Sequence, residues 1–136
     1  MPEIKAIDAT PQRPEGNRVV DAPVLEIDLN KFMEELKDEP TWKESDRNSI
    51  TIHKSASLVM VLMGLQAGAE LKPHKAEGIL TLQVIKGEIE FITENKKTLL
   101  SKRNMIVLHE NIFHSVIALE ESFVLLSIAK VKEEKE

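Results

Sequence analysis

Two stretches of sequence, each containing one histidine of interest, decide the fold of this chain. The first runs GAELKPHKAEGILTLQVIKG from Gly68 to Gly87 and contains His74. The second runs RNMIVLHENIFHSVIA over residues 103–118 and contains His114. Both combine short apolar runs with turn-forming glycine or asparagine. That combination predicts β-strands joined by tight turns.

Short apolar segments continue on both sides of these stretches, from residue 50 to residue 129. Turn-forming residues separate them at intervals of about 8–12 residues, which predicts an antiparallel β-sandwich or barrel. Segment 58–65 is apolar on both faces, as expected where one face points inward and the other meets a second layer. The expected strands are Ile50–His53, Leu58–Leu65, Ile79–Ile85, Ile89–Ile92, Thr98–Leu100, Met105–Leu108, Ile112–Leu119 and Ser122–Ala129.

One short helix is expected before the strands, at about residues 29–38. Asp28 can cap its start, and Pro40 should stop it. Trp42 follows this helix and is expected to be a packing anchor. The apolar residues that recur with helical spacing are Leu29, Phe32, Met33 and Leu36.

The expected organisation has three parts. Residues 1–48 form an N-terminal arm and a helix that packs on the barrel. Residues 49–130 form a single antiparallel β-barrel or jelly roll, and residues 131–136 form a charged tail. The 136 residues are enough for one domain, not two. The fold class is therefore mainly β with one short helix.

Composition limits the possible partners. The formal net charge of −5 argues against long-range attraction to nucleic acid or to an anionic membrane. No apolar run is long enough for a membrane span, and the first residues lack the pattern of a signal peptide. The chain has no cysteine, which removes thiolate chemistry and fits a cytoplasmic location.

The stretch from Gly68 to Gly87 resembles the first motif of the cupin superfamily, in its small single-domain bacterial form with an RmlC-like jelly roll. That motif spaces a glycine, two histidines, a glutamate and a second glycine. Here Gly68, His74 and Gly87 match, whereas Ala76 replaces the second histidine and Leu80 replaces the glutamate. The metal motif is therefore degenerate.

The second stretch resembles the second cupin motif through a single residue. His114 stands at the position of the motif histidine. Arg103 and Asn111 stand where the motif has glycine, His109 where it has proline, and Ala118 where it has asparagine. The order and the spacing of the two motifs, together with the strand pattern, carry the resemblance.

The resemblance implies a divalent metal, manganese, iron, zinc or nickel, held between His74 and His114. The missing ligands argue against tight binding, because stable sites generally need three or four protein ligands. Glu77 or His109 is the candidate third ligand. The alternative for the histidine pair is two neutral imidazoles at the end of an apolar pocket, where they bind a ligand or water.

The inward phase of the first-motif strand should carry Leu80, Leu82 and Val84, an apolar wall in place of a metal ligand. The expected ligand pocket consists of Leu80, Leu82, His74, His114 and Phe113. Met60 and Met63 fall on opposite faces of one strand, so at most one of them can line a cavity.

Two functional classes remain open. The first is a binding module for a small, largely apolar or weakly acidic molecule. The second is a metal-dependent enzyme, such as a dioxygenase or an isomerase of a small organic acid, with a reduced ligand set. A sugar-nucleotide epimerase is disfavoured, because the chain has no tyrosine to act with a histidine base. The two-sided apolar segment 58–65 and a possible exchanged arm at residues 18–27 favour a homodimer.

Overall fold

The computed structural model describes residues 19–130. The first 18 residues of the predicted N-terminal arm and the predicted charged tail at residues 131–136 lie outside this range. In the described residues two helices precede nine strands. The elements are α1 (Leu29–Asp38), α2 (Pro40–Glu44), β1 (Arg47–Lys54), β2 (Leu58–Leu65), β3 (Glu70–His74), β4 (Ile79–Lys86), β5 (Glu88–Thr93), β6 (Lys96–Ser101), β7 (Met105–Leu108), β8 (His114–Ala118) and β9 (Ser122–Ala129).

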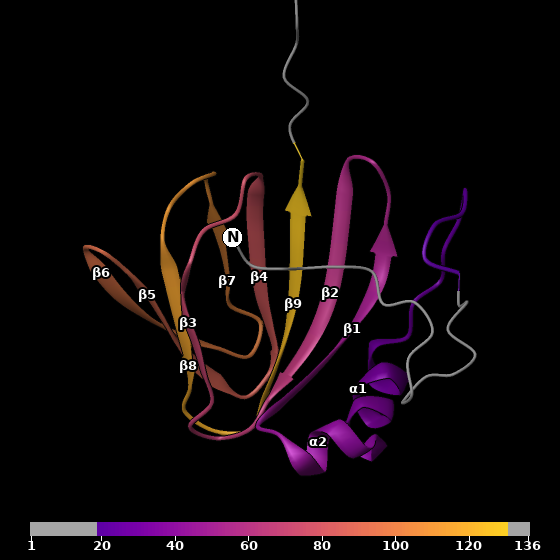
Figure 1. Ribbon diagram of the computed structural model, residues 1–136, viewed down its shortest axis with the longest axis horizontal. Coiled ribbons are helices and arrows are strands. Elements are labelled where there is room, and N and C mark those ends of the chain that lie inside the picture. The colour runs from indigo at the N-terminus through magenta and orange to yellow at the C-terminus, as the bar shows by residue number, and fades with distance from the viewer. Residues whose placement is uncertain (1–18, 131–136) are drawn as a thin grey trace, which may run out of the picture.

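The strands form two antiparallel sheets that face each other (Figure 1). One sheet has the order β1-β2-β9-β4-β7 and the other the order β3-β8-β5-β6. This arrangement agrees with the predicted jelly roll, but the sheets do not close into the predicted barrel. No hydrogen-bonded strand pair links them, so β1, β7, β3 and β6 remain edge strands within the described residues. Side-chain packing between the two inner faces holds the sheets together.

The predicted helix over residues 29–38 is confirmed as α1, and its start is capped as expected. The Asp28 side chain accepts a hydrogen bond from the Lys31 backbone N–H at 3.2 Å. Pro40 ends this helix, but it also begins α2, which was not predicted. Proline suits the first position of a helix, since its fixed φ is helical and no N–H is needed there. Neither helix is long and apolar enough to cross a membrane.

Both helices pack beside the outer face of β1 and β2 (Figure 1). Side chains in or next to the larger sheet also donate hydrogen bonds to C-terminal carbonyl groups of the helices, which have no partner within a helix. Asn48 of β1 donates to the Leu36 carbonyl oxygen at 2.9 Å. Gln66 donates to the Trp42 carbonyl oxygen at 2.7 Å. These bonds fix both helices onto the larger sheet.

The buried apolar residues divide into two groups on opposite faces of the larger sheet. The outer cluster lies beneath the helices and consists of Leu36, Trp42, Ile50, Ile52, Leu62 and Phe123. The inner core lies between the two sheets and consists of Val59, Val61, Leu65, Ala69, Ala76, Leu80, Leu82, Val84, Ile89, Phe91, Leu100, Val116, Ala118, Val124, Leu126 and Ile128.

Strand β2 contributes to both groups, as its two apolar faces predicted. Met63 packs on the inner core and Met60 on the outer cluster, so only Met63 can face a cavity. Because α1 contacts the outer face of β2, that face is not left open to solvent. This removes one reason for expecting a homodimer, which stays a prediction.

Four turn positions of the two motif stretches have a positive φ. Gly68 has a φ of 88° and Gly87 of 93°. Arg103 has a φ of 77° and Asn111 of 65°, in the left-handed region that normally favours glycine. These two residues stand where the resembling motif has glycine. At these two positions the chain therefore adopts a left-handed backbone conformation without glycine.

Candidate functional site

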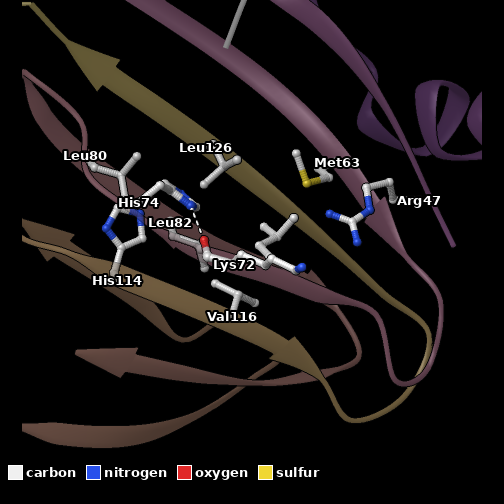
Figure 2. Close-up of a pocket in the computed structure, with 10 residues that line it drawn as sticks. Arg47, Met63, Lys72, His74, Leu80, Leu82, His114, Val116 and Leu126 are labelled. Atoms are coloured by element: carbon white, nitrogen blue, oxygen red, sulfur yellow. Dashed lines mark hydrogen bonds between the residues drawn. The ribbon is translucent and has the colours of Figure 1, made fainter. Parts of the chain in front are cut away.

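A cavity of about 290 Å³ lies between the two sheets (Figure 2). Both sheets supply its walls, so it occupies the part of the interior that the core residues leave unfilled. Its size suits a small organic molecule, since it falls near the lower end of typical ligand pockets. It is lined by Arg47, Met63, Leu71, Lys72, His74, Leu80, Leu82, His114, Val116 and Leu126.

His74 and His114 face each other at one end of the cavity. They are register partners on the neighbouring strands β3 and β8, so both project from the same face of the smaller sheet. Their ring centroids are 4.3 Å apart, at an interplanar angle of 69°. The His114 ring also stacks on Phe91, with centroids 5.4 Å apart and planes 13° from parallel. The structure thus brings together two histidines that are 40 positions apart in the sequence.

Backbone carbonyl groups determine which nitrogen of each ring carries hydrogen. His74 Nδ1 lies 2.6 Å from the Lys72 carbonyl oxygen, and His114 Nδ1 lies 3.0 Å from the Ile112 carbonyl oxygen. Because a carbonyl oxygen only accepts, each Nδ1 must be the donor. A neutral ring then has its lone pair on Nε2. For these two histidines, Nε2 is the nitrogen that can accept a hydrogen bond or bind a metal.

Burial keeps His114 in its neutral form. Only 3% of the residue is exposed. Loss of solvation lowers the pKa of His114 below its ordinary value, and the nearby His74 lowers it further, while the hydrogen bond to Ile112 acts in the opposite direction. At neutral pH His114 is therefore an uncharged acceptor.

The residues present do not fit a tightly held divalent metal. No group of three or more histidine, cysteine, aspartate or glutamate side chains is placed for metal binding in residues 19–130. Ala76, at the position of the missing motif histidine, is 3% exposed and packs in the inner core. Leu80, at the position of the missing glutamate, is part of the cavity wall. Two imidazoles supply fewer ligands than a stable site generally uses.

Neither predicted third ligand joins the histidine pair. Glu77 is exposed on the loop between β3 and β4. The His109 side chain is 78% exposed and lies 3.5 Å from the Glu110 carboxylate. Both residues belong to loops, whose backbone turns them outward, whereas the histidine pair is held by strand alternation. His53, on β1, is not part of the histidine pair either. Its Nε2 lies 3.1 Å from the Ser55 hydroxyl.

Of the predicted pocket residues, Leu80 and Leu82 line the cavity with the two histidines, whereas Phe113 does not. Phe113 is 57% exposed and borders a separate hollow of about 470 Å³. The Lys75 ammonium group lies 5.3 Å from its ring centroid. Phe113 directly precedes the inward-facing His114, and neighbouring positions of an extended chain point to opposite faces.

Sequence reasoning missed five of the lining residues and left Met63 as one of two options. The missed residues are Arg47, Leu71, Lys72, Val116 and Leu126. Arg47 shares the alternation of Ser49 and Thr51, opposite to that of Ile50, but alternation alone does not tell which of the two faces points into the cavity. Arg47 is the register partner of the inner core residue Leu65, which places it on the cavity side of β1.

Arg47 is held in place by three hydrogen bonds. Its Nε and Nη2 donate to the two carboxylate oxygens of Asp46, at 2.8 and 3.3 Å. Its Nη2 also donates to the Glu70 carbonyl oxygen of β3, at 2.9 Å. The first contact lowers the pKa of Asp46, so this carboxylate stays charged. Arg47 thus connects the two sheets at one edge of the cavity.

The chain is similar in structure to several solved proteins. A conserved Streptococcus pyogenes protein of unknown function matches 96% of this chain and 99% of its own length, with 19% identity and a TM-score of 0.66. A cupin-2 domain protein from Shewanella frigidimarina matches 76% of this chain and 94% of its own, with 14% identity and a TM-score of 0.62. A cupin 2 conserved barrel domain protein from Leptotrichia buccalis is 31% identical, with a TM-score of 0.59.

The Leptotrichia match covers 64% of this chain and 42% of the other. No family model matches the chain, and no curated protein matches it. The resemblance seen in the two motif stretches therefore agrees with independent structural likeness, although most of the metal ligands of those motifs are absent. The chain is a small protein with the cupin fold.

Proposed function

We propose that the protein binds a small organic molecule in the cavity between its two sheets. The observation that carries this proposal is the lining itself. Aliphatic side chains and one methionine form most of the wall, and a few polar groups converge at its ends. Ligand pockets generally have this composition, in which apolar contact gives affinity and a few polar groups fix orientation.

The histidine pair suits binding of a ligand rather than a structural role alone. Every buried side-chain nitrogen and oxygen in the described residues has a partner or reaches open space. His114 Nε2 has no protein hydrogen-bond partner in that range, and His114 lines the cavity. A neutral Nε2 there accepts a hydrogen bond from a hydroxyl, an amide or water.

The experiment follows backbone amide chemical shifts while hexanoate, hexanamide or benzyl alcohol is added. We expect shift changes confined to cavity residues and their neighbours. Leu126 lines the cavity and is only 6% exposed. Leu126→Phe should therefore remove the shift changes, because the larger ring would extend into the cavity. Leu99→Phe is the matched control, since Leu99 is 58% exposed and outside the cavity. Binding that survives Leu126→Phe unchanged, or that maps elsewhere, would rule the proposal out.

The second candidate is a metal-dependent enzyme, a dioxygenase or an isomerase of a small organic acid, with a reduced ligand set. The observation in its favour is that both adjacent rings donate a hydrogen bond from Nδ1 to a carbonyl oxygen. Both Nε2 atoms therefore remain able to bind a metal. The candidate requires a metal that two protein ligands hold.

Metal analysis of the protein, purified without a histidine tag, separates the two candidates. We expect less than stoichiometric manganese, iron, zinc or nickel in the wild type. Ala76→His with Leu80→Glu restores the two missing ligands of the motif and should raise the metal content to about one ion per chain. A stoichiometric metal in the wild type that His74→Ala removes would instead favour the enzyme.

A further inference from the structure

The ionisable groups of the cavity lining are all basic. They are Arg47, Lys72, His74 and His114, and no aspartate or glutamate lines the cavity. The chain as a whole is acidic, with a formal net charge of −5. Positive charge in this lining, opposite in sign to the net charge of the chain, favours an anion at that place.

Lys72 carries the uncompensated charge. No salt bridge to its ammonium group occurs within residues 19–130, whereas Arg47 is paired with Asp46. Lys72 belongs to β3, two residues after Glu70, whose carbonyl oxygen binds Arg47. Figure 2 shows the Lys72 amine on the Arg47 side of the cavity, away from His114. The fixed cation of Arg47 and the free cation of Lys72 thus share one end.

Arg47 supplies a hydrogen-bond donor in a fixed position beside the Lys72 charge. Its Nε and Nη2 are occupied by Asp46 and by the Glu70 carbonyl, so the guanidinium plane is fixed. Its Nη1 makes no hydrogen bond within the described residues and remains able to donate to a ligand. A preorganised donor loses little entropy when it binds a carboxylate oxygen.

We propose that the ligand is a small organic acid, with its carboxylate at Lys72 and Arg47 and its apolar part along the aliphatic wall toward the histidine pair. This inference rests on the proposed function and specifies its ligand class and orientation. Leu82, Val116, Met63 and Leu126 lie between the two polar ends (Figure 2), and Leu71 also lines the cavity. A ligand with one acidic end and one apolar body matches this order of groups.

The test compares hexanoate with hexanamide, which has the same carbon chain and nearly the same shape but no charge. Dissociation constants come from the amide chemical-shift titration. We expect hexanoate to bind about tenfold more tightly, close to the lower end of the usual contribution of one hydrogen bond to a charged group. Lys72→Gln should reduce this preference to about twofold or less. Lys72 is exposed, so the variant should fold normally.

Lys75→Gln is the matched control. It removes the same charge three residues away, from a side chain that lies over Phe113 and outside the cavity. It should keep the preference for hexanoate. Equal loss in the two variants would show a general surface effect of charge and would overturn the inference.

The remaining outcomes distinguish this inference from the proposed function. Equal affinity for hexanoate and hexanamide, with both bound in the cavity, overturns the anion site and leaves the binding function standing. Absence of binding by either probe at about 10 mM, a concentration that reveals very weak affinities, overturns both.

Discussion

The two faces of the larger sheet are packed in different ways. The outer cluster beneath α1 and α2 is tightly packed around Phe123, since Trp42 stacks on this ring with centroids 5.7 Å apart. A Cβ atom added at Gly64 would lie 2.6 Å from the Phe123 ring. The inner core is larger, yet a cavity of about 290 Å³ remains between the two sheets. Dense packing stabilises a fold, and a protein keeps an unfilled interior at a cost in stability. The difference leaves the space between the sheets, and not the helix side, as the place for the proposed ligand.

The largest expected effect comes from deleting side chains on the two faces. Phe123→Ala should lower the free energy of unfolding by about 3–5 kcal/mol, because Phe123 is fully buried and contacts Trp42. Leu126→Ala should cost about 2 kcal/mol, since one side of Leu126 already borders the cavity and has fewer contacts to lose. Urea denaturation monitored by circular dichroism measures both values. Equal losses would contradict the comparison.

Much of this arrangement was predictable from sequence, for a physical reason. Strands β2, β7 and β9 have the predicted bounds, because their apolar runs end at clear turn residues. Strand β3 was not predicted as a strand. It is short, contains Pro73 and is mostly exposed, so hydrophobic alternation gives it almost no signal. Because β3 was not predicted, Lys72 on this strand was not included in the expected pocket.

The faces of β1 show a second limit of sequence reasoning. Its buried isoleucines, Ile50 and Ile52, lie in the outer cluster beneath the helices. Arg47 lies on the other face and reaches the cavity. When a sheet is covered on both sides, alternation separates the two faces but does not tell which one points inward. Short α2 escaped prediction because proline both ends one helix and begins the next.

A smaller effect with the same logic comes from adding atoms on each face. Gly64→Ala should destabilise the protein by about 1–3 kcal/mol, because the new methyl group meets the Phe123 and Trp42 rings. Val116→Ile places one extra methylene against the cavity and should change stability by less than about 1 kcal/mol. Thermal unfolding by calorimetry measures the pair. A larger loss for Val116→Ile than for Gly64→Ala would show that the cavity is not open to extra volume.

The smallest expected effect is a pH dependence that belongs to the inner face alone. Burial lowers the pKa of His114 in the folded state, so below the unfolded value of about 6.5 the unfolded chain binds more protons than the folded one. The free energy of unfolding should therefore decrease as the pH falls from about 6.5 toward the lower folded pKa, by at most about 1.4 kcal/mol per pH unit. Below the folded pKa this contribution should level off.

His114→Gln should flatten this part of the pH profile, whereas His109→Gln should keep the wild-type slope, because the His109 side chain is 78% exposed. Urea denaturation at pH values from about 5 to 7.5, the range in which histidine titrates, measures the slopes. The outer cluster contains no ionisable side chain, so its variants should shift the whole profile without changing the slope. A wild-type slope retained in His114→Gln would mean that protonation of another group sets the pH dependence, and that His114 contributes to the cavity through its shape and hydrogen bonds alone.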